Sequence, residues 1–204
     1  MIRAVFFDFG GVLADEGFRE GLIVIGKRNG LDPDQFFSSA RELIHGTGYV
    51  TGTTDEAHFW DTLRKATGIK GSDKELRRKI LDRFALRERM LGIVRNVRSL
   101  GLITAILSDQ TNWLDEINRR SPFYRYFDFV FNSYVLKKSK RDASVFTEVC
   151  AIVGVKPWEA LFVDDDVENT KKAQAAGMRT ILFRETGEFE RALRAMIQNY
   201  PADG

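Results

Sequence analysis

Carboxylates and a hydroxyl follow three separate apolar runs of the sequence, and together they could hold a cation and a phosphate. Asp8 follows the first run and Ser108 follows the second. The adjacent pair Asp164 and Asp165 follows the third. Burying several carboxylates together is unfavourable unless a cation neutralises them or some become protonated. All-oxygen ligands suit a hard cation, for which we expect Mg²⁺, and that cation would then attract a phosphate group.

The order of apolar runs along the chain indicates how those residues come together. Five short runs combine β-branched, aromatic and aliphatic residues at lengths that suit buried strands: Ile2–Phe7, Leu102–Leu107, Phe127–Phe131, Ala160–Val163 and Thr180–Phe183. Continuous apolar character is typical of parallel strands covered on both faces. Helical periodicity lies between the later runs, at Met90–Leu100, Val145–Val153 and Asn169–Ala176. The alternation predicts a doubly wound α/β fold with a parallel sheet, and ligands bind beyond the carboxyl ends of the strands in such sheets.

Residues 16–88 interrupt this alternation. They contain amphipathic helical segments and no run that suits a buried strand; the segments are Asp34–Ile44, Asp55–Thr67 and Asp73–Leu86. Asp55 and Asp73 are the expected N-caps, because an Asp side chain accepts hydrogen bonds from the first backbone N–H groups of a helix. The sequence therefore predicts an α/β core made of residues 1–15 and 89–204, with a helical domain inserted at residues 16–88.

The composition is that of an ordinary soluble globular protein. Of the 204 residues, 44% are hydrophobic and 29% are charged, with a formal net charge of +2. This balance provides no basic surface for nucleic acid or an anionic membrane, and no apolar run approaches the roughly 18 residues that span a bilayer. The apolar stretch near the N-terminus is too short for a signal peptide, and the single cysteine, Cys150, suits a reducing compartment. We expect a cytoplasmic protein with no nucleic-acid or membrane partner, and the sequence leaves its oligomeric state open.

Four segments of the chain resemble the motifs of a known superfamily. DFGGVL at residues 8–13 is similar to the first motif of the haloacid dehalogenase-like (HAD) superfamily, and Ser108 stands at the second. Lys140, within KRDASVF, is similar to the third motif, and VDDD at residues 163–166, followed by Asn169, is similar to the fourth. The motifs occur in the family order, and the helical insertion stands where the subfamily with an α-helical cap carries it. The resemblance covers almost the whole chain and implies a Rossmann-like HAD core with a helical cap.

The resemblance implies covalent phosphoryl transfer. Asp8 would attack the phosphorus of a small phosphorylated metabolite and form an aspartyl-phosphate, which water then hydrolyses. Ser108 and Lys140 would stabilise the phosphoryl oxygens as charge develops on them. On this interpretation the protein is a hydrolase of the phosphoric monoester class.

The resemblance also implies a Mg²⁺ site. The ligands would be Asp8, Asp165 and the backbone carbonyl of Gly10, with Asp164 binding directly or through water. The cation would shield the like charges of the nucleophile and the phosphate from each other.

Each of these assignments has a simpler alternative. Asp8 could cap a turn after the strand, and Ser108 could be a helix N-cap, a position at which serine is common. Lys140 lies in the run KKSKR, so Lys137 or Lys138 could take its place. Asn169 either hydrogen-bonds near the metal or only begins a helix.

Gly10 departs from the family pattern. Phosphatases of the superfamily usually carry Asp two residues after the nucleophile, where it protonates the leaving group and activates water, and glycine can do neither. General acid–base assistance contributes about 10²–10⁴-fold, so we expect a slow phosphatase or one restricted to good leaving groups, with Asp109 or a water as candidate proton donors. Two other functions stay open. One is a non-catalytic binding or regulatory protein, and the other is a 2-haloacid dehalogenase, in which Asp8 attacks carbon and the halide leaves without a proton.

The histidines and the large aromatic residues carry weaker indications. His45 and His58 both lie in the helical insertion without the spacing of a metal pair. We expect surface or packing roles for both, with His58 as the one that could approach the entrance to the site. Phe59 and Trp60 are expected to pack the insertion, and Trp113 could line the entrance.

Overall fold

A parallel sheet of five strands forms the centre of the molecule. The structure is a computed structural model that describes residues 1–197, so residues 198–204 of the predicted core lie outside the described part. The strands lie in the order β3-β2-β1-β4-β5, and all neighbouring pairs are parallel. Their bounds are β1 Ala4–Phe7, β2 Ile103–Ser108, β3 Phe129–Asn132, β4 Ala160–Asp164 and β5 Arg179–Leu182. Each predicted strand overlaps one of these, which confirms the α/β fold.

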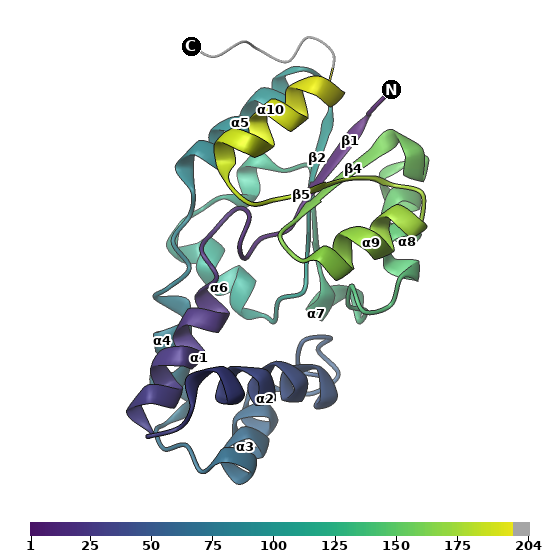
Figure 1. Cartoon of the computed structure of the whole chain (residues 1–204). Coiled ribbons are helices and arrows are strands. Elements are labelled where there is room, and N and C mark those ends of the chain that lie inside the picture. The colour runs from purple at the N-terminus through teal and green to yellow at the C-terminus, as the bar shows by residue number, and fades with distance from the viewer. Residues whose placement is uncertain (198–204) are drawn as a thin grey trace.

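Helices cover both faces of the sheet. α5 and α10 lie over one face, and α8 and α9 lie over the other (Figure 1). Successive side chains of a strand point to opposite faces, so Val5 and Phe7 pack into one apolar cluster and Ala4 and Phe6 into another. This two-sided burial is why the strands have continuous apolar sequences. The bounds of the core helices, including the short 3₁₀ helices η1 and η2, are α5 Glu88–Ser99, α6 Trp113–Arg120, η1 Tyr124–Tyr126, α7 Ser133–Leu136, α8 Ser144–Val153, η2 Pro157–Glu159, α9 Val167–Ala175 and α10 Thr186–Met196.

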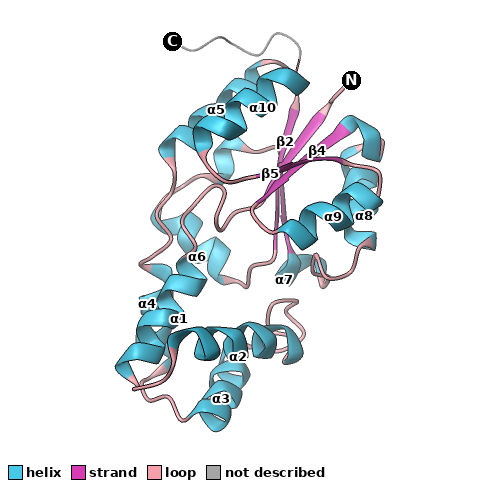
Figure 2. Ribbon diagram, viewed as in Figure 1, coloured by secondary structure: helices cyan, strands magenta, loops and turns pink. Residues whose placement is uncertain are grey.

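Helices α1 to α4 lie beyond the carboxyl ends of the strands (Figure 1). Their bounds are α1 Gly17–Arg28, α2 Pro33–Gly46, α3 Glu56–Thr67 and α4 Asp73–Leu81. Figure 2 shows helices and loops alone in this segment, and the structure has no β-strand between residues 17 and 87. Phe59 and Trp60 are fully buried there, as predicted. No helix among residues 1–197 is both long enough and apolar enough to cross a lipid bilayer.

The start of α4 corrects one capping prediction. Asp55 caps α3 as predicted and accepts a hydrogen bond from a backbone N–H of the first turn. Asp73 is wrong as the N-cap of α4, because Ser72 takes that position and forms a reciprocal capping box with Glu75. The helix also ends at Leu81, earlier than predicted, since the chain then turns back toward the sheet.

Two connecting segments join these four helices to the sheet and run side by side. The backbone N–H of Asp15 donates to the carbonyl of Ala85 at 3.0 Å, and that of Arg87 donates to the carbonyl of Leu13 at 2.9 Å. The pairing holds the start of α1 close to the end of β1. The residues between β1 and α1 therefore lie at the carboxyl edge of the sheet.

Aromatic side chains connect the four helices to the core. Trp60 stacks on Trp113 of α6 with ring centroids 6.0 Å apart, and the indole N–H of Trp113 donates to Oε2 of Glu56 at 3.1 Å. The hydroxyl of Tyr49 donates to Oδ1 of Asn112 at 2.7 Å. These contacts determine how the helices sit over the strand ends.

Candidate active site

Three adjacent strands end in polar residues. β1 lies between β2 and β4; Asp8 follows β1 directly, and Ser108 is the last residue of β2. Asp164 is the last residue of β4. All three are buried, and the backbone N–H of Asp8 donates to the carbonyl of Val163 at 2.8 Å. Because the strands are parallel, their ends bring together residues that are far apart in the sequence.

Lys140 forms ion pairs with two of the carboxylates. Its Nζ lies 2.9 Å from Oδ2 of Asp8 and 2.7 Å from Oδ2 of Asp164. The Lys140 side chain is 3% exposed and that of Asp164 is 0% exposed, so this ion pair is almost completely shielded from water. Burial alone would lower the pKa of Lys140, but the carboxylates of Asp164 and Asp8 outweigh burial and raise that pKa above its usual range. The lysine is therefore a permanent positive charge at the site.

The neighbouring lysines point elsewhere. Lys137 donates to the carbonyl of Gly52 at 2.8 Å, and Lys138 pairs with Glu148 at the surface. Asp109 holds the loop in register, since its carboxylate accepts two hydrogen bonds from the backbone N–H of Lys140, at 2.9 and 3.2 Å. Of the three lysines in this run, only Lys140 reaches Asp8.

Asp164 and Asp165 have different surroundings. Both oxygens of Asp164 are engaged, by Lys140, by the backbone N–H of Asp166 at 2.7 Å and by Nδ2 of Asn169 at 3.2 Å. No side chain or backbone group of another described residue donates a hydrogen bond to the Asp165 carboxylate. The pKa of Asp165 is raised to about 6, first by burial and second by the nearby Asp8 carboxylate. Asp165 is thus a carboxylate that still needs a positive partner.

The carboxylates fit a divalent cation. One oxygen from each of Asp8, Asp164 and Asp165 lies within 4.8 Å of the others, the geometry of residues that could hold a metal ion. Lys140 provides one positive charge to the three carboxylates, so negative charge remains. Gly11 packs tightly here with φ +77, and a Cβ on it would lie 2.2 Å from Oδ2 of Asp165. The first loop therefore approaches Asp165 closely, and an all-oxygen set of this kind suits Mg²⁺.

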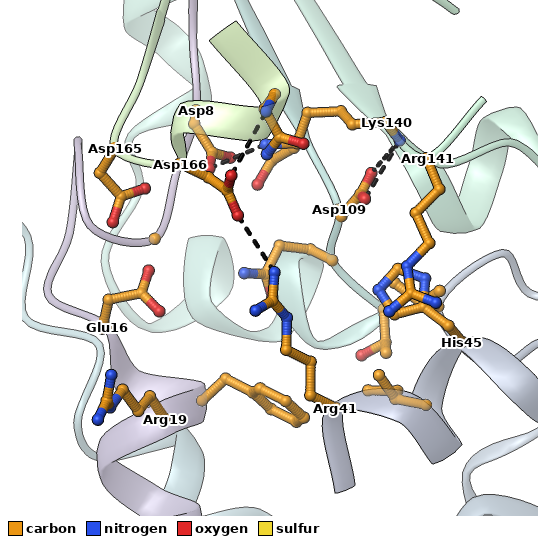
Figure 3. Close-up of a pocket in the computed structure, with 18 of the residues that line it drawn as sticks. Asp8, Glu16, Arg19, Arg41, His45, Asp109, Lys140, Arg141, Asp165 and Asp166 are labelled. Carbon is orange, nitrogen blue, oxygen red and sulfur yellow. Dashed lines mark hydrogen bonds and ion pairs between the residues drawn. The ribbon is translucent and has the colours of Figure 1, made fainter. Parts of the chain in front are cut away.

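A cavity of about 350 Å³ opens above these residues. It has two walls with different origins (Figure 3). The strand-end wall includes Asp8, Ser108, Asp109, Lys140 and Asp165. The cap wall comes from α1 and α2 and includes Phe18, Arg19, Phe37, Arg41 and His45. The space is at the small end of the range for small-molecule sites, roughly 300–1,000 Å³.

A family model described as haloacid dehalogenase-like hydrolase matches residues 2–177. The chain belongs to this family. The resemblance inferred from the four motifs is confirmed, and so is the prediction of a hydrolase.

Individual relatives of this HAD-like hydrolase match parts of it or its fold. Bifunctional epoxide hydrolase 2 of Rattus norvegicus is 31% identical over 111 residues, 51% of this chain and 20% of that protein. Enolase-phosphatase E1 of Monosiga brevicollis is 40% identical over 48 residues, 24% of this chain and 16% of that protein. The matched segments thus span a fifth or less of these curated relatives.

Solved structures match nearly the whole chain. The HAD family enzyme bt-2542 from Bacteroides thetaiotaomicron has a TM-score of 0.77 at 24% identity, covering 95% of this chain and 98% of that one. The same enzyme has been crystallised in complex with magnesium and inorganic phosphate. At this level of identity the likeness establishes the fold.

Three residues of the second and fourth motifs lie at or beside the cavity of the HAD-like site. Ser108 lines the cavity and does not cap the next helix, whose N-cap is Asn112. Asn169 contacts Asp164. Asp166, the last acidic residue of the fourth motif, is the half-exposed N-cap of α9 and pairs with Arg41 across the cavity at 3.1 Å.

Glu16 is a residue that the motifs did not indicate. It lies between β1 and α1 and lines the cavity. Its pKa is raised to about 7, first by burial and then by the carboxylates of Asp165 and Asp8. Glu16 joins the other acidic side chains only because the chain folds back over the strand ends. The one signal in the sequence was that Glu16 comes shortly after the first motif.

The histidine that reaches the HAD-like site is His45, not His58. His45 lines the cavity, whereas His58 is exposed on α3. The pKa of His45 is lowered to about 4, first by burial and then by Arg141, which leaves the imidazole neutral near pH 7. Trp113 is 1% exposed and touches the cavity from the core. Both α2 and α3 have the amphipathic pattern, so periodicity alone did not distinguish the two histidines.

Proposed function

We propose that this chain is a Mg²⁺-dependent phosphatase that hydrolyses a small phosphorylated metabolite through an aspartyl-phosphate at Asp8. One observation carries the proposal: the ion-paired group of Asp8, Lys140 and Asp164 lies beside an unpartnered Asp165 at the strand end of a small cavity. The arrangement holds one carboxylate ready for attack and leaves negative charge for a cation to neutralise. Similarity to an enolase-phosphatase and to a fold captured with magnesium and phosphate supports it.

The residues on the strand-end wall would divide the chemistry among them. Asp8 would attack phosphorus with one of its two carboxylate oxygens. Oδ1 accepts a hydrogen bond from the backbone N–H of Phe9 at 2.7 Å, and Oδ2 pairs with Lys140. The attacking oxygen must give up one of these contacts as the phosphate arrives. Lys140 and the hydroxyl of Ser108 would then stabilise the negative charge that develops on the phosphoryl oxygens.

The cation would be held by Asp8, Asp165 and the backbone carbonyl of Gly10. Asp164 would act through water or through Lys140, because its oxygens already have protein partners. When bound, Mg²⁺ supplies the positive charge that lets an anionic phosphate approach an anionic nucleophile.

The helical segment would select the leaving group. We propose that residues 16–88 form a cap over a core of residues 1–15 and 89–204. The cap wall offers the apolar rings of Phe18 and Phe37 beside Arg41 and His45. A small organic group with polar substituents would fit against this surface, and larger substrates would not fit within about 350 Å³.

Turnover of phosphate esters with and without Mg²⁺ tests the function. We expect hydrolysis of small phosphate monoesters that needs Mg²⁺ and is lost with a chelator. Because residue 10 has no side chain to protonate a leaving group, we expect slower turnover of alkyl esters, which need that proton, than of aryl esters, which do not. Halide release from 2-chloropropionate without metal would instead indicate a dehalogenase. Absence of turnover on a broad panel of esters would indicate a binding or regulatory protein.

A further inference from the structure

Glu16 occupies the space that a side chain at residue 10 would take. A Cβ built on Gly10 would lie 2.8 Å from Oε1 of Glu16. The backbone of Gly10 does not have positive φ, so its conformation alone does not demand glycine. The carboxyl of Glu16, at the start of α1, therefore lies where an Asp at residue 10 would place its own side chain.

The backbone on both sides of Glu16 is held in place. Glu16 is the N-cap of α1, and its carbonyl accepts a hydrogen bond from the N–H of Glu20 at 2.9 Å. Asp15 before it is bonded to Ala85, and Gly17 after it lies against the ring of Phe84 so closely that a Cβ would be 2.5 Å from it. Figure 3 shows the Glu16 side chain directed into the cavity toward the strand ends. The backbone contacts of residues 15–17 therefore hold the Glu16 carboxyl in this orientation.

The Glu16 carboxylate has no other evident task among the described residues. It makes no side-chain hydrogen bond or ion pair with any of residues 1–197. By contrast, Asp109 holds the backbone of Lys140, and Asp166 pairs with Arg41. Glu16 also lies outside the group of carboxylates whose oxygens meet closely enough to share a metal ion, which contains Asp8, Asp164 and Asp165.

We propose that Glu16 is the general acid and base of the phosphoryl transfer at Asp8. The inference rests on the proposed phosphatase function and names the proton donor that Gly10 cannot be. It depends on position: Glu16 lines the same cavity as Asp8 and comes from the side of the cap, where the leaving group of a bound ester would lie. A carboxyl within reach of the leaving oxygen is what proton transfer requires.

The proton is accounted for over the two steps. In the first, an oxygen of Asp8 forms a bond to phosphorus, the bond from phosphorus to the ester oxygen breaks, and that oxygen takes its electron pair and the proton of Glu16. In the second, the Glu16 carboxylate removes a proton from water, whose oxygen bonds to phosphorus. The bond from phosphorus to Asp8 then breaks, which releases inorganic phosphate, and Glu16 is protonated again.

Substitution of Glu16 by the isosteric amide tests the proposal. We compare Glu16→Gln with wild type in saturating Mg²⁺, using glycerol phosphate as an alkyl ester and p-nitrophenyl phosphate as an aryl ester. Nitrophenolate leaves without a proton, so kcat/KM for the alkyl ester should fall by about 10²–10³-fold and that for the aryl ester by less than about 10-fold. The variant should also release a burst of nitrophenol, because hydrolysis of the aspartyl-phosphate has lost its base. Glu20→Gln, an exposed change on the same helix, is the matched control and should behave as wild type.

The outcomes separate this inference from the function on which it rests. Equal loss on both esters, or no loss on either, would overturn the role of Glu16 while the phosphatase stands. A higher Mg²⁺ requirement with an unchanged ratio of alkyl to aryl turnover would also overturn it and make Glu16 a metal-site residue. If wild type hydrolyses neither ester with Mg²⁺, the phosphatase function fails and the proposal fails with it.

A relocated carboxyl provides a second test. Gly10→Asp alone places its Cβ against Glu16, so we expect it to raise alkyl turnover by no more than about 10-fold. In the double variant Gly10→Asp with Glu16→Gln, the new carboxyl replaces the lost one. The double variant should recover at least about 10-fold of the alkyl activity that Glu16→Gln loses. No recovery in a folded double variant would contradict the equivalence of the two positions.

Discussion

The two walls of the cavity hold their charges in opposite ways. On the strand-end wall, the almost completely buried Lys140 pairs with Asp8 and with the fully buried Asp164. From the cap wall, Arg41 pairs with Asp166 across the cavity, and these side chains are 54% and 33% exposed. Removing one partner of a buried pair costs about 3–5 kcal/mol, whereas exposed pairs contribute about 0–1 kcal/mol. Substitutions on the strand-end wall should therefore affect chemistry and stability together, and those on the cap wall should have smaller and separable effects.

Asp8→Asn should have the largest effect on activity. The amide cannot attack phosphorus under these conditions, so hydrolysis of every phosphate ester should be lost. Phosphate release measures the activity, and beryllofluoride, a phosphoryl mimic, should bind wild type but not the variant. Asp61→Asn changes an exposed aspartate of α3 in the same way and should retain wild-type turnover. Wild-type turnover in Asp8→Asn would rule out the covalent mechanism.

Asp165→Ala should remove the Mg²⁺-dependent activity and leave the chain folded. The variant loses a metal ligand but also relieves the repulsion between Asp165 and Asp8. Wild type should gain about 1–3 kcal/mol of stability at Mg²⁺ concentrations from tenfold to a hundredfold above its Kd. The variant should show no such gain, which thermal unfolding with and without Mg²⁺ measures. An equal Mg²⁺-induced rise in Tm for both proteins would take Asp165 out of the metal site.

Lys140→Met should show how strongly the strand-end wall depends on this buried lysine. Three carboxylates then face one another without a lysine, and we expect the free energy of unfolding to fall by about 3–5 kcal/mol in the absence of metal. Urea unfolding at pH 7 measures the loss. Lys138→Met breaks a surface ion pair in the same loop and should leave the unfolding midpoint close to that of wild type. Equal midpoints for all three proteins would show that burial of the Lys140 pair contributes nothing to stability.

His45→Gln should produce the smallest change, visible only at low pH. The pKa of His45 is lowered to about 4 by burial and then by Arg141; Arg41 and Lys172 add to this and Glu42 opposes it. The unfolded chain takes up a proton near pH 6.5 and the folded chain only near pH 4, so wild type loses stability as pH falls through this window.

The variant lacks this proton uptake and should lose about 1 kcal/mol less than wild type between pH 7 and pH 4.5, a figure reduced because the imidazole is partly exposed. Urea unfolding at the two pH values measures the difference. His58→Gln, which removes an exposed imidazole, is the control. Equal losses of unfolding free energy between pH 7 and pH 4.5 in wild type and in His45→Gln would show that folding does not lower the pKa of His45.

Much of the strand-end wall was predictable because it depends on a one-dimensional pattern. Buried parallel strands must be apolar along their length, so a polar residue at the end of such a run stands out, as Asp8 and Asp164 do. The carboxyl ends of neighbouring parallel strands meet at one edge of the sheet. Alignment with the third motif favoured Lys140 but left Lys137 and Lys138 open, and the structure places only Lys140, of these three, beside Asp8.

The unequal surroundings of the two acidic residues in the fourth motif could not be predicted in the same way. Asp164 and Asp165 are adjacent and chemically identical in the sequence. Only the fold shows that Lys140 and Asn169 take up the oxygens of Asp164, because those partners come from a different loop and from the following helix.

The α/β core, the helical nature of the insertion and the residues at the strand ends could be predicted from the chain, since each follows from local patterns of apolar and polar side chains. The packing of distant elements was needed to show that Glu16 fills the place of a side chain at residue 10 and that His45, rather than His58, lines the cavity. Amphipathic periodicity shows that a helix has an apolar face, but not which element covers that face. The cap wall is set by how α1 and α2 pack over the strand ends, and that packing depends on contacts between residues distant in sequence, such as Trp60 with Trp113.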